Sequence, residues 1–270
     1  MRESGGALTW LAAVYIFAVM DFDISDLLSS WEFQPGQVLV RRFTGQDGRE
    51  KLQLRVDLGL LQMNMDGRPD GKRPHGYDSL FDYYQAKLHK HVAEHDGSDE
   101  GFKLKAEDCA RLQLEALQYH QRYFCLLQLE EYDSVIRDGE RNLVAFEFVS
   151  RHAETEELAW SLLQFQPQLL MVMVRARAAQ ALQTQDFDAA IRFGEEGIES
   201  IRKFFQEHGR GDVAEQSGEI LSLESWLSDI RSRKPLSPRE KLERALNEAI
   251  QKEDYEQAAK YRDELKNLRD

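Results

Sequence analysis

The sequence predicts a mainly α protein built of helical hairpins, with a small N-terminal antiparallel β-hairpin or three-stranded meander and a C-terminal helical hairpin. Three observations predict this class. Apolar and polar residues alternate between residues 38 and 65, as in a strand with one buried face. Helical spacing begins at residue 77 and continues to the end of the chain. The 270 residues are 42% hydrophobic, which is enough for a sizeable core.

The chain begins with an apolar stretch, Ala7–Met20, that resembles the hydrophobic part of a signal peptide. Fourteen residues are too few to span a bilayer, and the flanking residues do not fit an exported leader. We therefore expect residues 1–19 to be either a signal-like leader or not native, with Met20 as the alternative start. The sequence predicts a cytoplasmic protein without a membrane segment.

The strand pattern follows. The runs Val38–Phe43 and Lys51–Leu58 are separated by a turn rich in glycine and aspartate, so we expect them to pair as a hairpin. Gly59 interrupts the alternation and marks either a bulge or a bend into a third short strand at Gln62–Met65. Residues 66–76 are rich in Gly, Pro and Asp and are predicted to form a loop.

Helices account for the remainder of the chain. They are expected at residues 77–94, 106–128, 131–150, 154–164, 168–184, 187–207, 213–231, 238–252 and 255–268. The run Leu169–Val174 is apolar on all sides, which predicts a central, buried helix.

The charge distribution limits the partners of this protein. The formal net charge is -13, and residues 153–230 carry six basic against fourteen acidic side chains. Only residues 231–270 are slightly basic, with eleven basic against nine acidic side chains. Because nucleic-acid affinity comes largely from cations on the protein, direct nucleic-acid binding is not expected. It stays open as a third hypothesis for Arg231, Arg233, Lys234, Arg239 and Lys241.

Motifs for catalysis or cofactor binding are not found. Cys109 and Cys125 are sixteen positions apart, which fits neither a zinc site nor a redox pair, so we interpret them as buried thiols. Gly67–Arg73 has too few residues between its glycines for a phosphate loop and lacks its Ser or Thr. We therefore assign no catalytic residue, no cofactor-binding residue and no cofactor.

The segment His91–His95 matches the HxxEH pattern of inverted zinc proteases. His91 and His95 would lie on one helical face, with Glu94 beside them as a base. These two histidines are the weak metal candidates of the sequence, and a zinc-dependent hydrolase is the alternative function. The helix end at which they lie favours solvated histidines over a shielded zinc site, so no metal is expected.

An internal repeat is more informative. "EYDSVIRDGERNL" at Glu131, "DFDAAIRFGEEGI" at Asp186 and "DYEQAAKYRDEL" at Asp254 share an order of acidic, aromatic and acidic residues followed by small or apolar ones. Each acidic residue can cap the N-terminus of the second helix of a hairpin. The aromatic residue and the small residue three positions later can pack on the preceding helix.

The middle copy resembles a tetratricopeptide repeat, because Ala178 precedes Ala190 by twelve positions. Gly194 and Gly197 fall where that family prefers larger residues, and the copies are 55 and 68 positions apart instead of 34. We therefore expect tetratricopeptide-like hairpins without a regular array.

The C-terminus carries the clearest local signals. Ser237 and Glu240 form a capping box with Pro238 at the first helical position. Two apolar stripes follow at spacings of three and four, and their alanines permit two short antiparallel helices to approach closely.

These residues resemble the UVR motif of the excision-repair proteins UvrB and UvrC and of activators of bacterial arginine kinases. The matching positions are Leu242, Leu246, Ala249, Glu256, Ala258, Ala259, Arg262, Asp263 and Leu268. Ile250, Tyr255 and Tyr261 depart from the usual residues. From Met20 to about Tyr84, the chain also resembles uncharacterised bacterial proteins that end in this motif. The resemblance implies protein contact, often with a like motif on another chain.

The prediction is therefore a non-catalytic bacterial adaptor whose hairpin docks on a partner, which is another UVR-motif protein or a second copy of this chain. The expected partner-binding residues are Leu242, Leu246, Ala249, Ile250, Tyr255, Ala258, Ala259, Arg262, Asp263, Leu265 and Leu268. A link to excision repair or stress response follows from family association alone. The other alternative is a structural protein whose tail only caps its own scaffold.

The expected organisation has five parts. They are a leader at residues 1–19, a β-containing segment at 20–76, a helical scaffold at 77–232, a linker at 233–238 and the UVR-like hairpin at 239–270.

Overall fold

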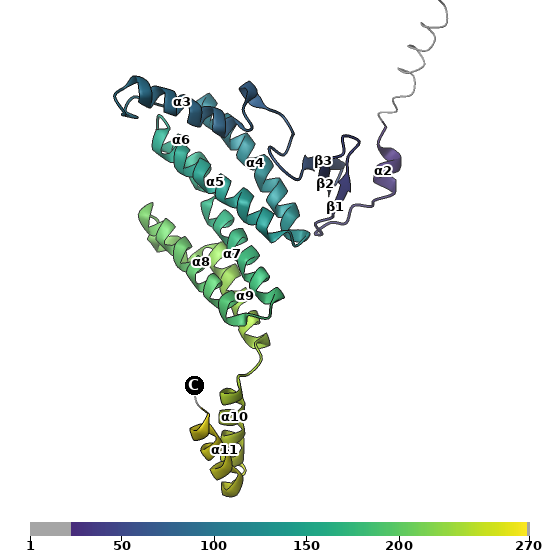
Figure 1. Ribbon diagram of the computed structural model, residues 1–270, viewed down its shortest axis with the longest axis vertical. Helices are drawn as coiled ribbons and strands as arrows, with labels where there is room; N and C mark the ends of the chain where they lie inside the picture. The colour runs from purple at the N-terminus through teal and green to yellow at the C-terminus, as the bar shows by residue number, and fades with distance from the viewer. Residues whose placement is uncertain (1–22, 269–270) are drawn as a thin grey trace, which may run out of the picture. The chain divides into compact units, whose positions relative to one another are not determined.

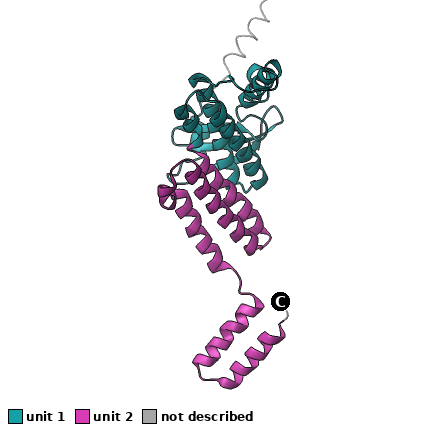
Figure 2. Ribbon diagram, turned by 90° about the vertical axis from the view of Figure 1, so that its left-hand side faces the viewer, with its two compact units in different colours: residues 1–163 teal, residues 164–270 magenta. Residues whose placement is uncertain are grey.

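The computed structural model describes residues 23–268 (Figure 1), so the leader expected at residues 1–19 lies outside the described residues. The described chain is mainly helical, with one small antiparallel sheet near its start, which confirms the predicted fold class. By its contacts the chain divides into two compact units, residues 1–163 and residues 164–270 (Figure 2).

The first unit opens with a short helix and a three-stranded meander. Its elements are α2 (Ser25–Ser29), β1 (Val40–Thr44), β2 (Glu50–Val56) and β3 (Gly59–Asn64), in the sheet order β1-β2-β3. Leu54 at the centre pairs with Val40 on one side and Leu61 on the other. Gly59 pairs with Val56 across a two-residue turn and begins the third strand, so it forms the predicted bend and not a bulge.

Both faces of the central strand are covered. Leu52 is fully buried, as the alternation predicts, but Gln53 and Arg55 on the opposite face are only 7% exposed. Arg55 donates to the carbonyl oxygen of Trp31 at 2.8 Å, and the guanidinium of Arg41 lies 4.3 Å from the Trp31 ring centroid. The residues before the sheet therefore cover its polar face, which sequence alternation alone does not reveal.

The helices of this unit form a hairpin with two flanking helices. They are α3 (Leu80–Glu94), α4 (Ala106–Gln128), α5 (Tyr132–His152) and α6 (Glu156–Leu163), preceded by the short 3-10 helix η1 (Pro74–Gly76). The antiparallel helices α4 and α5 pack on each other, α6 packs against both of them, and α3 packs against α4.

A buried ion pair joins this hairpin to the loop after the sheet. Arg122 and Asp138 have side chains only 1% and 2% exposed, and they form two hydrogen bonds of 2.6 and 2.8 Å. Arg122 also donates to the carbonyl oxygens of Asn64 and Gly67, at 3.0 and 2.7 Å. Because an uncompensated charge in such a position is costly, the pair fixes the loop on the helices.

A second buried carboxylate fixes the start of α3. The Glu115 side chain is fully buried and accepts hydrogen bonds from the backbone N–H groups of Leu80 and Phe81, at 2.7 and 3.1 Å. Arg141 pairs with the same carboxylate. A carboxylate from α4 therefore satisfies the unpaired N–H groups of the first turn of α3.

The second unit contains two helical hairpins. Its elements are α7 (Gln166–Gln183), α8 (Phe187–Glu207), the 3-10 helix η2 (Gly211–Gln216), α9 (Gly218–Arg233), α10 (Pro238–Gln251) and α11 (Tyr255–Asn267). The predicted helix at residues 213–231 is divided, because Ser217 caps α9 by accepting from the N–H of Ile220 at 3.2 Å. Helix α7 is buried along its apolar run, as expected.

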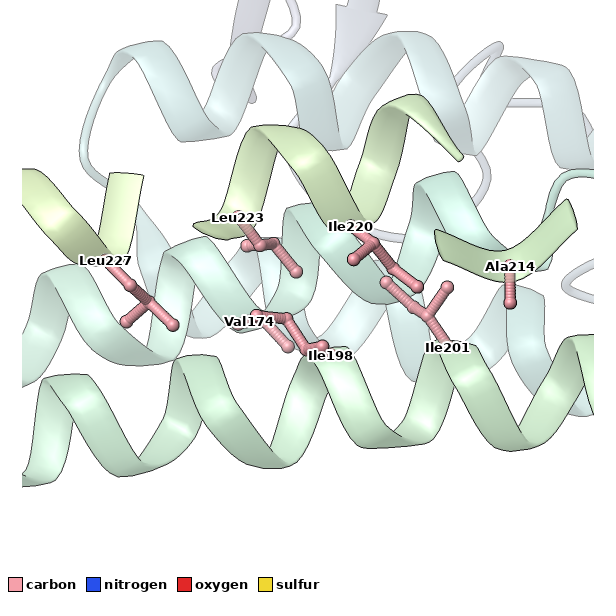
Figure 3. Close-up of a cluster of buried hydrophobic side chains, with 7 residues drawn as sticks. All are labelled: Val174, Ile198, Ile201, Ala214, Ile220, Leu223 and Leu227. Atoms are coloured by element: carbon pink, nitrogen blue, oxygen red, sulfur yellow. The ribbon is translucent and has the colours of Figure 1, made fainter. Parts of the chain in front are cut away.

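Helix α9 covers the hairpin formed by α7 and α8 (Figure 3). The buried cluster between them consists of Val174, Ile198, Ile201, Ala214, Ile220, Leu223 and Leu227. Gly194 leaves room for the side chain of Leu227, since a Cβ at this position would overlap it. Gly197 leaves room for Val174 in the same way. Close helix packing therefore explains both glycines at positions where a tetratricopeptide repeat has larger residues.

The buried ion pair gives a first prediction. Asp138→Ala leaves the Arg122 guanidinium buried without its carboxylate and should lower the free energy of unfolding by about 3 to 5 kcal/mol, as measured by urea denaturation. The control is Glu215→Ala, which removes an exposed ion pair with Arg202 and should cost much less, because surface ion pairs contribute little to stability. Equal losses for the two variants would contradict the role given to Asp138.

The glycine contact gives a second prediction. Gly194→Ala places a methyl group against Leu227 and should destabilise the protein by about 1 to 3 kcal/mol through overpacking. Gly218→Ala is the matched control, because no atom lies within 4 Å of its added Cβ. If the midpoints of thermal unfolding of the two variants coincide, the helices are less closely packed than described.

Candidate protein-binding site

The C-terminal hairpin begins with the predicted capping box. Ser237 Oγ accepts from the backbone N–H of Glu240 at 3.1 Å, and Glu240 Oε2 accepts from the backbone N–H of Ser237 at 2.7 Å. Pro238 occupies the first helical turn. The hydrogen bonds from Ser237 favour the ionised form of Glu240 and lower the pKa of its carboxyl group below the usual value.

The turn between α10 and α11 is equally well defined. Glu253 adopts a left-handed conformation with φ of 58°, and the N–H of Asp254 donates to the Ala249 carbonyl oxygen at 2.9 Å. The Asp254 carboxylate then accepts from the N–H of Gln257 at 3.1 Å and caps α11. These hydrogen bonds join residues that are close in the sequence, and they define the turn of the hairpin.

The predicted partner-binding residues fall into three groups by exposure. Ala249 and Ala258 are 7% exposed and form the seam between the two helices, because small side chains permit close packing. Four residues are half-buried, namely Leu242, Leu246, Ala259 and Leu265. The buried alanines hold the hairpin together and are not available to a partner.

The remaining predicted residues lie on the surface. Ile250, Tyr255 and Leu268 are 49%, 70% and 38% exposed. Arg262 and Asp263 are also exposed and form an ion pair of 2.8 Å with each other. Large apolar side chains on so small a hairpin are the features that a partner surface can cover.

Leu236 is a further exposed apolar residue, 41% exposed, directly before the capping box. In the sequence it falls within the linker expected at residues 233–238. There it is a single leucine among polar and proline residues, and only the structure shows that its side chain is exposed.

The same turn occurs three times in the described chain. The residue before the N-cap has a φ of 59° at Glu130, 60° at Gln185 and 58° at Glu253. In each turn the N-cap N–H donates to a carbonyl oxygen five residues earlier, at 3.0, 2.9 and 2.9 Å. Val135, Ala190 and Ala258, four residues after each N-cap, are all buried. The sequence repeat is therefore a structural repeat.

The basic residues near the linker are largely paired with carboxylates of this chain. Arg231 lies 2.6 Å from Glu195, and Lys234 lies 2.6 Å from Asp188. Arg233 and Arg239 pair with Asp229 and Glu243, respectively. Among the five residues of the nucleic-acid hypothesis, four thus have an acidic neighbour, and the geometry gives that hypothesis no support.

The histidine motif is engaged in local hydrogen bonds. The rings of His91 and His95 stack with centroids 3.9 Å apart. His91 Nε2 lies 2.9 Å from the Glu100 carbonyl oxygen, and His95 Nδ1 lies 2.7 Å from the His91 carbonyl oxygen. Over residues 23–268, no group of three His, Cys, Asp or Glu side chains is arranged to hold a metal ion. The geometry therefore does not support the zinc hydrolase alternative.

The other residues considered for chemistry have structural environments. Cys109 and Cys125 are free and buried, and burial raises the pKa of their thiols to about 11 and about 12. Thiols with such pKa values are poor nucleophiles at neutral pH. In the loop that resembles a phosphate loop, Arg68 pairs with Asp70 at 3.0 Å and with Glu115 at 3.5 Å.

Comparison with known proteins finds a family match in the C-terminal segment of this chain. Residues 238–270 match the family described as the UvrB/uvrC motif, and the matched segment coincides with the hairpin of α10 and α11. No curated protein and no solved structure matches the chain. In the described part of the chain, no helix is both long enough and apolar enough to cross a membrane. The match indicates a role in protein interaction related to DNA repair.

A third prediction concerns the capping box. Ser237→Ala removes the acceptor for the Glu240 N–H and should destabilise α10 by about 1 kcal/mol, seen as faster hydrogen exchange of its first-turn amides. The control is Ser200→Ala in the interior of α8, where the hydroxyl donates to the Glu196 carbonyl oxygen. Unchanged exchange in α10 would show that the capping box does not hold this helix.

Proposed function

We propose that this protein is a bacterial, cytoplasmic adaptor without catalytic activity, and that its C-terminal hairpin docks on a helical surface of a partner protein. The observation that carries the proposal is the match of residues 238–270 to the UvrB/uvrC motif. The partner is another protein with such a motif or a second copy of this chain. A connection to excision repair rests on the family alone.

The exposure of the hairpin supports this proposal. Ile250 and Tyr255 flank the turn between α10 and α11, and both present large apolar side chains to solvent. Ala249 and Ala258 are the buried residues of the hairpin, whereas Ile250 and Tyr255 are 49% and 70% exposed. Covering Ile250 and Tyr255 removes apolar area from water, which favours association.

The organisation that we propose keeps the boundaries expected from the sequence. Residues 239–270 are the recognition element, 233–238 are the linker, 77–232 are the scaffold and 20–76 are the β-containing segment. Pro235 and Pro238 lie in the linker region, where α9 ends and α10 begins. Two free buried thiols are consistent with a reducing compartment, which supports the cytoplasmic location.

The alternative, a structural role, leads to a different expectation. If the tail only caps its own scaffold, Ile250 and Tyr255 contact no partner, and changing them would not alter binding to other proteins. The two functions are therefore separable by surface substitutions that leave the seam of the hairpin intact.

The test, and our fourth prediction, uses the full chain as bait in affinity capture. The variant Ile250→Asp with Tyr255→Asp should lose the captured partner, because two carboxylates replace the apolar contact. Leu58→Asp is the matched control, since Leu58 is 90% exposed in the turn of the sheet and should not affect capture. Analytical ultracentrifugation of the same three proteins detects a second copy as the partner. If all three baits retain the same proteins and the same sedimentation, the hairpin is not the recognition element.

A further inference from the structure

Because their turns are related, the hairpin of α7 and α8 can serve as a template for the hairpin of α10 and α11. We call the first of these the template hairpin. Within each hairpin, positions can be counted from the N-cap residue, which is Asp186 for α8 and Asp254 for α11. The two N-caps have almost the same backbone angles, with φ of -83° and -84° and ψ of 78° in both. Residues at equal distances from these N-caps therefore occupy equivalent positions in the two hairpins.

The template hairpin carries a third helix, whereas the C-terminal hairpin carries none from the described part of the second unit. Helix α9 packs against both α7 and α8, and its side chains complete the buried cluster (Figure 3). In the described part of the second unit, residues 164–268, no third helix packs extensively against α10 and α11. Within these residues, the position that α9 occupies on the template is therefore open on the C-terminal hairpin.

The equivalent positions have a different chemical character. Val174, twelve residues before its N-cap and part of the cluster under α9, corresponds to Leu242, which is half-buried. Gly194 and Ile198, eight and twelve residues after the N-cap, correspond to Arg262 and Lys266. We call Leu242, Arg262 and Lys266 the third-helix face.

The change from glycine to arginine is informative. In the first unit, the residue eight positions after the N-cap Glu131 is Gly139, which is buried like Gly194. Both internal hairpins thus bury a glycine at this position, whereas Arg262 leaves 57% of its side chain exposed. A helix on the third-helix face cannot approach as closely as α9 does, and it must meet two cations.

From this geometry we infer that the third-helix face binds an amphipathic helix whose rim is acidic. Its apolar side chains meet Leu242, and its carboxylates meet Arg262 and Lys266. Arg262 already pairs with Asp263, but a guanidinium has five N–H donors and retains some for a second carboxylate. The inference rests on the proposed function and specifies the class of partner and where it lies on the hairpin.

Helix α9 itself suggests a probe. The segment of residues 217–233 includes its own cap, Ser217, and carries Leu223 and Leu227 together with three carboxylates. A fluorescent peptide of this segment carries the apolar residues of α9 with three carboxylates and two arginines, Arg231 and Arg233, and serves as the acidic probe. The peptide in which Glu219, Glu224 and Asp229 are all replaced by lysine is its matched control.

The fifth prediction concerns binding of these peptides to the full chain, measured by fluorescence anisotropy at low salt. The acidic peptide should bind, and Arg262→Glu with Lys266→Glu should weaken binding by about tenfold, because two ion pairs become repulsive. Lys260→Glu on the same helix lies outside the third-helix face and should bind the peptide like the unchanged protein. The lysine peptide should not bind.

Two outcomes overturn the inference. One is an acidic peptide that does not bind at a concentration of about 1 mM, and the other is equal binding to the charge-reversed protein. The affinity capture described above distinguishes this failure from failure of the proposed function. If the charge-reversed bait keeps a partner that the Ile250 and Tyr255 variant loses, the hairpin recognises a partner through its turn end, and the third-helix face is not used.

Discussion

An antiparallel pair of α-helices buries one stripe of each helix and leaves an outer face of the pair to be covered, and this constraint governs the helical part of the structure. The hairpin of α4 and α5 is covered by α6, and the hairpin of α7 and α8 is covered by α9. The C-terminal hairpin repeats the same turn, but no further helix of residues 164–268 packs extensively on it. Ile250 and Tyr255, at the turn end of this hairpin, are exposed as well, and the proposed function depends on these two residues.

The turn that recurs in all three hairpins is specified locally. A left-handed residue other than glycine costs free energy, and here it precedes an N-cap whose N–H reaches back to the first helix. At Asp186 and Asp254 the carboxylate also accepts an N–H of the new helix. At Glu131 no such side-chain cap is formed. The backbone arrangement is therefore common to the three turns, and the carboxylate cap is an addition in two of them.

The packing of the first unit depends on buried charged side chains. Arg122 with Asp138 and Glu115 with Arg141 connect segments that are distant in the sequence, namely the loop after the sheet, α3, and the hairpin of α4 and α5. Burying such groups is costly unless ion pairs and hydrogen bonds compensate for the lost hydration. Their contribution is to fix one arrangement of loop and helices, since a displaced loop would leave buried charges without partners.

The sequence by itself determined the helices, the capping box, the turn repeat and the family of the last thirty residues, because capping, turn geometry and apolar periodicity depend on neighbours within a few positions. Only the tertiary structure decided which side of each element is covered. Arg55 is buried because Trp31 and Phe33 lie against it, and Gly194 is required because Leu227 occupies its space. For the predicted partner-binding residues, the tertiary structure likewise separated the seam alanines from the exposed Ile250 and Tyr255. Burial arises from contacts between residues far apart in the chain, and a local pattern does not encode which distant segment supplies them.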